Sequence, residues 1–269
     1  MKNIVIVAKN QETHFIHRVI EEAGQNNCDF FDPWKDLILP EGQRYLVRTT
    51  GIHHSDLDLL MLGSLEQSKL VNPLESLKIF RSKASQYQWM ERESFPVLPW
   101  LDLVGHDPLI VEKFFRLYPY MVVKPHCGQG GWGIEILTWD SFKSWWKKRK
   151  NIDEQYLIQP YQKDSEEFRY FFIKNEWSAV LKRTAKHGVA ANFKNQGHAE
   201  KAELPIEILT TLHSIVNRSG LYYGAIDLLV DDLEFVILDV NSVPGVEQLE
   251  AVTGENVMAR LLSAKFFCQ

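Results

Sequence analysis

The stretch Val236-Ile237-Leu238-Asp239-Val240-Asn241-Ser242-Val243-Pro244-Gly245 decides how the rest of this chain is interpreted. Its first half belongs to an apolar run over residues 234–240, which is rich in β-branched side chains and predicts a strand. A second apolar run, residues 223–230, comes just before it, and Asp231-Asp232-Leu233 supplies a turn between the two. The two runs therefore predict an antiparallel pair of strands.

Each of these predicted strands carries one acidic residue inside its apolar run, Asp227 in the first and Asp239 in the second. On a paired sheet both acids can lie on neighbouring strands, and Asn241, two residues beyond Asp239, faces the same side. Two carboxylates and one carboxamide form an oxygen-only site that suits Mg²⁺ carrying phosphates. A buried carboxylate without a partner is costly, which favours this interpretation. The alternative is that both acids point to solvent on an edge strand.

Length and composition are those of an ordinary globular chain. The 269 residues are 45% hydrophobic and 24% charged, enough for one large domain or a few small ones. The net charge of −5 gives no global preference for nucleic acid. No apolar run approaches the length of a membrane span, and the start of the chain lacks a signal-peptide pattern. The three cysteines are scattered, which suits a reducing, cytoplasmic location. From the charge and the lack of a long apolar run we expect neither nucleic acid nor membrane as a partner.

The first 71 residues predict a small α/β domain that ends near Asn72-Pro73. The predicted elements are strands at residues 3–8 and 46–48 and helices at residues 11–23 and 57–65. Their alternation favours parallel strands, and Gly24 fits the end of the first helix. The turn after the first strand lacks a Gly-X-Gly-X-X-Gly pattern, which argues against a dinucleotide site there.

A glycine-rich loop follows the predicted strand at residues 120–125, in which Lys124 is the last residue but one. The loop residues singled out as binding candidates are Gly128, Gln129, Gly130, Gly131, Trp132 and Gly133. Glycines allow positive φ and bring backbone N–H groups close to phosphate oxygens. The loop does not have the Walker A pattern, because no Gly-Lys-Ser/Thr follows and the next segment, residues 134–137, predicts a strand. A plain flexible turn is the alternative explanation.

The remaining segments predict an alternation of helices, strands and one long polar loop. Helices are predicted at residues 77–90, 141–150, 206–219 and 246–262, strands at residues 156–161, 168–173 and 177–183, and a loop over a site at residues 185–199. The first of these helices carries Lys83, which taken alone is more simply explained as a solvated lysine.

In their order and spacing these features resemble the ATP-grasp superfamily and, within it, the RimK-like carboxylate–amine ligases. The best matches are Val122-Val123-Lys124-Pro125 running into the glycine loop, and Asp239–Gly245 followed by Glu250 and Thr253-Gly254. The resemblance covers residues 72–262. It implies a fold of α/β and α+β lobes: a small α/β domain at 1–71, and an ATP-grasp domain at 72–269 whose central lobe is at about 119–160 and whose C-terminal lobe is at about 161–269.

The resemblance also implies how ATP is held. Lys83 and Lys124 would neutralise phosphate oxygens, and the glycine loop would cover the β- and γ-phosphates. Adenine would meet the segment Gln159-Pro160-Tyr161, through the Pro160 carbonyl and the Tyr161 N–H. The other implied nucleotide-binding residues are Glu167, which would accept ribose hydroxyls, and Asn192.

Metal and catalytic roles follow from the same resemblance. Asp227, Asp239 and Asn241 would hold Mg²⁺, with Mn²⁺ as a substitute. Arg169 and Arg183 would stabilise the transferring γ-phosphoryl group or the substrate carboxylate. The sequence departs from the family in having aspartate at 239, where glutamate is common. It also has Ala190-Ala191 where an arginine is expected shortly before Asn192, and a proline at 160 where an acid is frequent.

The implied function is ATP-dependent formation of an amide or peptide bond through an acyl phosphate. The substrates would be a small-molecule or peptide carboxylate and an amine. Such a reaction needs positioning and charge rather than a side-chain nucleophile. Two alternatives stay open: an ATP-grasp kinase that phosphorylates a hydroxyl, and a degenerate ATP-binding module. A homodimer is compatible with the helix that carries Trp145-Trp146.

Overall fold

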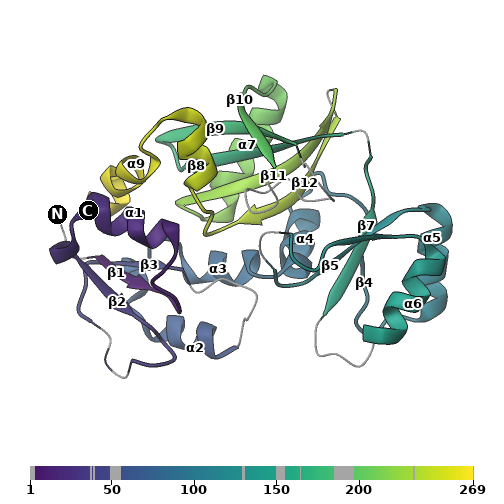
Figure 1. Cartoon of the computed structure of the whole chain (residues 1–269), viewed down its shortest axis with the longest axis horizontal. Helices are drawn as coiled ribbons and strands as arrows, with labels where there is room; N and C mark the ends of the chain where they lie inside the picture. The colour runs from purple at the N-terminus through teal and green to yellow at the C-terminus, as the bar shows by residue number, and fades with distance from the viewer. Residues whose placement is uncertain are drawn as a thin grey trace.

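A computed structural model describes residues 4–36, 38, 40–48, 56–128, 131–149, 155–163, 165–184, 197–232 and 234–268. Within these ranges the strands form three sheets. Figure 1 shows a small N-terminal sheet at the lower left, a sheet of C-terminal strands at the top and a third sheet at the right. The fold is therefore of the α+β type with one parallel sheet, in agreement with the predicted combination of lobes.

The N-terminal sheet has the order β2-β1-β3, with β2 and β3 parallel to β1. Its strands are β1 (Ile4–Val7), β2 (Cys28–Phe31) and β3 (Arg44–Val47), and its helices are α1 (His14–Ala23) and α2 (Asp56–Ser64). The Thr13 side chain caps α1 by accepting from the Ile16 N–H, and Gly24 ends the helix at φ 83°. The predicted parallel strands are confirmed, whereas β2 was not predicted.

The helix predicted at residues 77–90 is wrong as a single element. The chain forms α3 (Leu74–Phe80) and then α4 (Lys83–Arg92), because Ser82 leaves the helical region with φ −115° and ψ 133°. The Lys83 N–H donates to the His126 carbonyl at 2.8 Å, which attaches the start of α4 to the end of β5. The break therefore places Lys83 next to the strand that carries Lys124.

The third sheet is antiparallel, in the order β4-β7-β5-β6. Its strands are β4 (Leu101–Asp102), β5 (Met121–Pro125), β6 (Glu135–Leu137) and β7 (Tyr156–Pro160), and its helices are α5 (Pro108–Leu117) and α6 (Trp139–Arg149). Side chains of both helices pack with the sheet in one apolar core. The helix α5 was not predicted, although Asp107 caps it by accepting from the Leu109 N–H and Pro108 opens it.

The C-terminal sheet is antiparallel throughout, in the order β10-β9-β8-β11-β12. Its strands are β8 (Glu166–Ile173), β9 (Trp177–Thr184), β10 (His198–Ala202), β11 (Tyr223–Asp231) and β12 (Glu234–Asn241). Apolar side chains of one face, among them Tyr170 and Ile226, form a core with α7 (Ile206–Ser219). The predicted loop at 185–199 is wrong at its end, where β10 begins, and residues 185–196 lie outside the described ranges.

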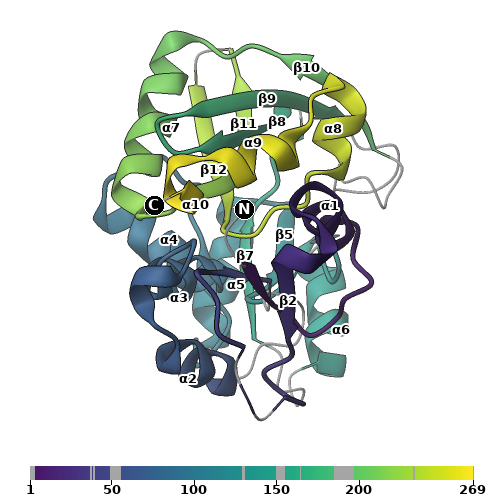
Figure 2. The same ribbon diagram turned by 90° about the vertical axis from the view of Figure 1, so that its left-hand side faces the viewer.

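The opposite face of the same sheet is divided into an apolar half and a polar half. In the apolar half, Phe171 and Ala225 pack with α1 and with the C-terminal helices α8 (Glu247–Thr253) and α9 (Val257–Ser263). Figure 2 shows α1 beside these helices. The predicted single helix at 246–262 is wrong, because Gly254 ends α8 at φ 68° and Asn256 caps α9. A short α10 (Lys265–Cys268) follows.

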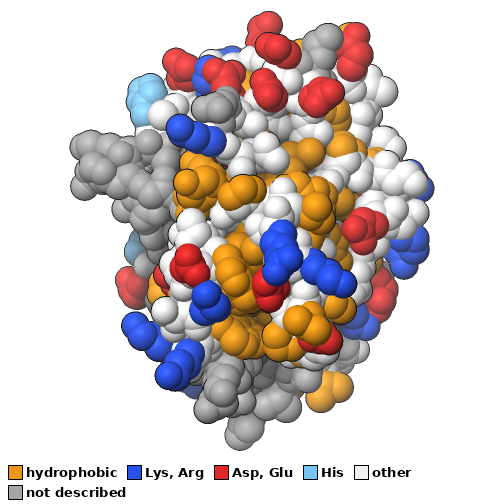
Figure 3. Space-filling view, turned by 90° about the vertical axis from the view of Figure 1, so that its right-hand side faces the viewer, with side chains coloured by type: hydrophobic (Ala, Val, Ile, Leu, Met, Phe, Trp, Pro, Cys, Tyr) orange, Lys and Arg blue, Asp and Glu red, His pale blue; other side chains and the backbone are white. Residues whose placement is uncertain are grey.

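Figure 3, which views the side of the molecule that carries α5 and α6, shows hydrophobic side chains gathered around lysines and arginines. The exposed apolar residues on or next to α5 are Leu109, Ile110, Leu117 and Tyr120. Among the described residues, every helix falls short of the length and apolar character that a membrane span requires.

Candidate active site

A cleft of about 490 Å³ lies where the three sheets meet. It is lined by the polar half of the C-terminal sheet, by α4, by the facing strand β5 with the end of β7, and by the start of α1. Most of the residues singled out from the sequence line it: Lys83, Lys124, Gly128, Gly131, Trp132, Pro160, Tyr161, Glu167, Arg169, Arg183, Asp227, Asp239 and Asn241. The fold thus brings together residues that are up to 158 positions apart, from Lys83 to Asn241.

The charged residues of the C-terminal sheet share one face because of strand register. Asp227 on β11 is directly opposite Arg169 on β8 and Asp239 on β12. Glu167 on β8 is opposite Arg183 on β9. Paired residues in an antiparallel sheet point to the same side, so these side chains form a polar row facing the cleft. The predicted placement of the two acids on neighbouring strands is confirmed.

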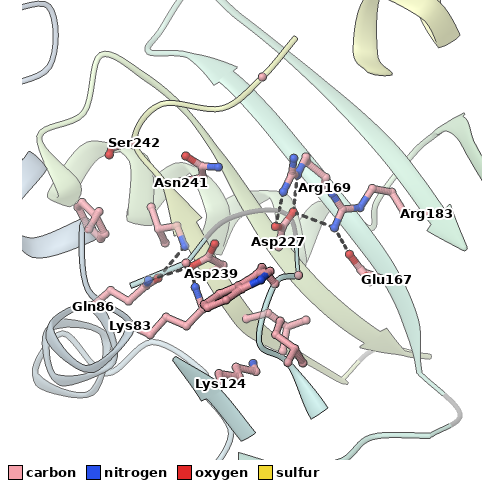
Figure 4. A pocket seen from close by; sticks show the side chains of 18 of the residues that line it. Lys83, Gln86, Lys124, Glu167, Arg169, Arg183, Asp227, Asp239, Asn241 and Ser242 are labelled. Atoms are coloured by element: carbon pink, nitrogen blue, oxygen red, sulfur yellow. Dashed lines mark hydrogen bonds and ion pairs between the residues drawn. The ribbon is translucent and has the colours of Figure 1, made fainter. Parts of the chain in front are cut away.

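Two arginines hold the acids of this row (Figure 4). Arg169 grips Asp227 with two parallel hydrogen bonds, from Nε to Oδ1 at 2.6 Å and from Nη2 to Oδ2 at 2.5 Å. Arg183 forms an ion pair with Glu167, and its Nη2 lies 3.7 Å from Asp227 Oδ1. Burial alone would raise the pKa of Asp227, but the charges of Arg169 and Arg183 outweigh it and lower this pKa to about 2. Asp227 is therefore an anion at neutral pH.

Asp239 receives its partners from α4. Gln86 Nε2 donates to Asp239 Oδ1 at 2.8 Å, while Gln86 Oε1 accepts from the Val240 N–H at 2.7 Å. Lys83 Nζ lies 3.5 Å from the same Asp239 oxygen. Figure 4 shows Lys83 and Gln86 reaching from the helix toward Asp239. Asp239, on β12, is thus held to α4 by a hydrogen bond from Gln86 and lies beside Lys83.

Lys124 lies on the other side of the cleft and has neutral partners. Its Nζ donates to Gln159 Oε1 at 2.7 Å and lies 3.4 Å from the Tyr87 hydroxyl. Desolvation and the charge of Lys83 lower the pKa of Lys124 to about 8, although Asp239, Glu167 and Asp227 favour its charged form. A buried lysine with neutral partners suits a site that an anion enters.

Buried donors without partners also point to an anionic ligand. Among the described residues that line the cleft, Arg183 has two buried donors, Nε and Nη1, without a hydrogen-bond partner. Such groups are costly unless a ligand or water accepts from them. The bound molecule they suit is rich in acceptor oxygens, as a triphosphate is.

The adenine contact predicted for Tyr161 is wrong in one detail. The Tyr161 N–H donates to the Tyr120 carbonyl at 2.9 Å, which continues the pairing of β7 with β5 and leaves this N–H unavailable to a ligand. Backbone groups alternate along a strand, so the Pro160 carbonyl and the Gln162 N–H point to the opposite edge. Both residues line the cleft.

The glycine loop is described in part. Gly131 and Gly133 both have φ 72°, a conformation that favours glycine, and exposed Trp132 lies between them. Two of the predicted residues, Gly133 and the buried Gln159, do not line the cleft. Gln159 contacts a residue that does, because its Oε1 accepts a hydrogen bond from Lys124. Gln129, Gly130 and Asn192 lie outside the described residues.

The donor set fits a hard divalent cation. Asp227, Asp239 and Asn241 all line the cleft and offer only oxygen ligands. In the described part of the chain, no group of three His, Cys, Asp or Glu side chains forms a metal cluster of its own. A cation here would therefore rely on ligand oxygens as well, which is how Mg²⁺ binds with nucleotides.

Among the lining residues that sequence reasoning did not single out are two with polar side chains that the site uses, Gln86 and Arg48. Gln86 is three positions after Lys83, and residues at that spacing share a helix face. Arg48 directly follows β3, and in parallel α/β sheets the carboxyl ends of strands are where ligands bind. Both signals were present in the sequence.

Comparisons with known proteins identify the class of fold and then the family. Over 97% of the chain the fold matches the D-alanine–D-alanine ligase from Bacillus anthracis, with TM-score 0.70, 17% identity and 95% of that chain covered. Over 96% it matches the ATP-grasp ligase PsnB complexed with a minimal precursor, Mg and ADP, with TM-score 0.71, 15% identity and 95% covered. The fold is thus that of ATP-grasp enzymes.

The RimK-like ATP-grasp domain family matches residues 109–264, so the chain belongs to this family and the predicted resemblance is confirmed. A similar curated protein is the tetrahydromethanopterin:alpha-L-glutamate ligase of Methanocaldococcus jannaschii. It is 29% identical over 152 residues, which are 52% of this chain and 51% of that protein. The chain spans about half the length of the first curated relatives that it matches.

Proposed function

We propose that this protein is an ATP-dependent carboxylate–amine ligase that forms an amide or peptide bond through an acyl phosphate. The observation that carries the proposal is the cleft itself, in which Lys83 and Lys124 face Asp227, Asp239 and Asn241. The two lysines would neutralise phosphate charge and the three oxygen ligands would hold the metal, which are the two needs of a metal-bound triphosphate. The family and the fold agree with this activity.

In this proposal the cleft binds ATP with its phosphates between the two sides. Lys83 and Lys124 donate to phosphate oxygens, and the protonated form of Lys124 becomes favoured when the triphosphate arrives. Asp227, Asp239 and Asn241 are the residues that would hold Mg²⁺, which spreads the charge of the phosphates and orients them. Adenine contacts the Pro160 carbonyl and the Gln162 N–H, and Glu167 faces the ribose.

The chemistry proceeds in two displacements. A substrate carboxylate oxygen attacks the γ-phosphorus, the bond to the β-phosphate oxygen breaks, and ADP leaves. An amine then attacks the carbonyl carbon of the acyl phosphate, the carbon–oxygen bond breaks, inorganic phosphate leaves and the amine proton passes to solvent. Arg183, with two unpartnered N–H groups facing a buried site, is placed to stabilise negative charge in the first step.

The experiment that tests this function measures ADP release from ATP and Mg²⁺ across a panel of carboxylic acids and amines. Hydroxylamine is added as the acceptor in parallel. The account predicts that ADP release requires a carboxylate and that hydroxylamine yields a hydroxamate, the product of a trapped acyl phosphate. A stable phosphoester on a hydroxyl substrate would indicate a kinase instead, and nucleotide binding without any turnover would indicate a degenerate module.

The finer assignments belong to the same proposal. The substrates are a small-molecule or peptide carboxylate and an amine, and glutamate is the first acid to test because it appears in the names of the curated relatives. Mn²⁺ would replace Mg²⁺ at an all-oxygen site. We further propose that the protein is cytoplasmic, forms a homodimer and does not bind nucleic acid. We propose two domains, residues 1–71 and 72–269, the second of which has a central and a C-terminal lobe.

A further inference from the structure

The cleft has a second end, defined here by the side chains that the N-terminal part of the chain contributes to its lining. Arg48, which follows β3, and Thr13, His14 and Phe15 at the start of α1 line this end together with the segment from Ser242 to Gln248. This segment begins directly after Asn241, the last of the candidate metal ligands. The second end is therefore next to the place where the γ-phosphate would react.

Arg48 is a charged group that the nucleotide site does not use. Its guanidinium lies over the ring of Phe15, 3.9 Å from the ring centroid, and its Nη1 donates to the carbonyls of Val243 and Pro244. Among the described residues no carboxylate pairs with it, in contrast to Arg169 and Arg183. Burial lowers the pKa of Arg48, and the neighbouring Tyr223 offsets this only in part.

The two carbonyls use Nη1 and Tyr223 lies beside the guanidinium, which leaves part of the arginine edge for a ligand. Stacking on Phe15 uses the flat face of the guanidinium, while its N–H groups point outward in the plane. Backbone carbonyls carry no net charge, so the positive charge of Arg48 stays uncompensated by the described residues. A planar anion with two oxygens, such as a carboxylate, matches an arginine edge best.

A second donor at the same end has no partner. The side-chain amide nitrogen of Gln248 is buried and lacks a hydrogen-bond partner among the described residues, and Gln248 lines the cleft. A buried donor left unpaired in this way costs free energy unless a ligand accepts from it. Arg48 and Gln248 come from opposite ends of the sequence, so the site forms only when the N-terminal part packs on the C-terminal helices.

We infer that Arg48, assisted by Gln248, binds a free carboxylate of the substrate, namely the α-carboxylate of an amino acid or the C-terminal carboxylate of a short peptide. The inference rests on the proposed ligase function and adds a substrate class to it. It assigns a specificity role to the N-terminal part of the chain, which contributes little to the proposed nucleotide site.

Ligand-observed NMR on the full-length protein, with and without Mg²⁺ and a non-hydrolysable ATP analogue, tests the inference. The probes are the common L-amino acids, each offered as the free acid and as its α-amide. We expect at least one free acid to bind at least about tenfold more tightly than its amide, and Arg48→Gln to weaken that acid by about 30-fold or more while leaving the amide nearly unchanged. Gln248→Ala should weaken the same acid by a smaller factor.

Arg44→Gln is the matched control. Arg44 is the first residue of β3, the strand that Arg48 follows, and it also donates to distant backbone carbonyls, those of Phe266 and Ser68, but it does not line the cleft. If Arg48 is only a structural tie, both variants will show the same change in acid binding. Arg48→Lys keeps a positive charge and should retain part of the preference for the acid, which separates loss of charge from misfolding.

The outcomes separate this inference from the proposed function. Equal binding of every acid and its amide by the wild type, or unchanged acid binding in Arg48→Gln, overturns the inference. Failure of the ATP analogue to bind the wild type would instead refute the nucleotide site. In that case the affinities of acids and amides measured without nucleotide still test the inference. Affinity for the analogue should change by less than about twofold in Arg48→Gln.

Discussion

At the scale of single residues, the charge and burial of Lys124 make nucleotide binding in the cleft dependent on protonation. The side chain is buried, and its direct partners, Gln159 and Tyr87, are neutral. A lysine in such surroundings loses part of its preference for the charged form, and an arriving anion restores it. Protonation of Lys124 and binding of a triphosphate are therefore linked.

This linkage predicts proton uptake on nucleotide binding. Because the pKa of Lys124 is lowered to about 8 in the free protein, the side chain is about half neutral at pH 8. Bound phosphates raise this pKa, so binding at pH 8 should take up about half a proton, and affinity should fall as pH rises through 8. Calorimetry in buffers of different ionisation enthalpy measures the uptake. Lys124→Met, which cannot titrate, should lose this component, and equal uptake by both proteins would contradict the prediction.

A substitution at Asp239 tests the other side of the cleft. Asp239→Asn keeps the size of the side chain but removes the negative charge that Lys83 and a cation require. We expect ATP turnover to fall by a factor on the order of 100 or more. Thermal unfolding should show a folded protein, and an exchange of Mg²⁺ for Mn²⁺ should change the residual rate little. Turnover near the wild-type value would refute the assignment of Asp239.

The acids could be placed from the sequence because alternation along a strand is a local property. The apolar runs that carry Asp227 and Asp239 and the turn between them were enough to predict a shared face. The partners of the acids were not predictable in the same way, since Arg169 reaches Asp227 through register between β8 and β11. Gln86 reaches Asp239 through packing of a helix on a strand.

At the scale of elements, the contact of α4 with β12 positions the site. The side-chain amide of Gln86 bonds both Asp239 and the Val240 N–H, so one residue joins the helix to the strand. Because the helix break at Ser82 sets where α4 starts, it also sets which helix face meets β12. The apolar residues of this region keep a helical spacing across the break, so the spacing does not show it; in the structure Ser82 is extended and the Lys83 N–H bonds the His126 carbonyl instead of a carbonyl of the preceding helix.

Gln86→Ala should destabilise the protein by about 2 kcal/mol, because it leaves the buried Val240 N–H without an acceptor. Chemical denaturation with urea measures this loss. Gln88→Ala is the matched control, since Gln88 is on the same helix but exposed, and it should change stability by less than about 0.5 kcal/mol. Equal effects of the two substitutions would show that the bridge contributes nothing.

At the scale of the whole molecule, the N-terminal part is joined to the rest through buried polar contacts as well as the apolar core. Asn72 is buried, and its amide donates to the carbonyls of Tyr223 and Ser242 and accepts from the Tyr222 and Tyr223 N–H groups. On the far side, Arg18 of α1 bonds Glu250 of α8. These contacts hold the N-terminal part, with Arg48, against the C-terminal sheet and helices.

Asn72→Ala should lower the free energy of unfolding by about 2 to 4 kcal/mol, because several buried backbone groups lose their partner at once. Differential scanning calorimetry checks this, with exposed Asn217→Ala as the control. The same variant should weaken substrate binding at the Arg48 end more than nucleotide binding. A stability equal to that of the wild type would contradict the role given to Asn72.

The overall architecture was predictable because the order of its motifs resembles a known family, and the parallel N-terminal strands followed from alternation of strands and helices. Other parts were hidden for physical reasons. The strand β10 is polar and exposed along much of its length, so it lacks an apolar pattern. The end of α8 at Gly254 was within reach of sequence reasoning, since glycine commonly ends a helix.

The most direct test of the central claim is a crystal structure of the protein with Mg²⁺ and a non-hydrolysable ATP analogue. The account predicts the triphosphate in the cleft, in contact with Lys83 and Lys124, with the cation bound by Asp227, Asp239 and Asn241 and the adenine at Pro160 and Gln162. A nucleotide bound elsewhere on the molecule, or one whose phosphates lie away from Lys124 and Asp239, would contradict it.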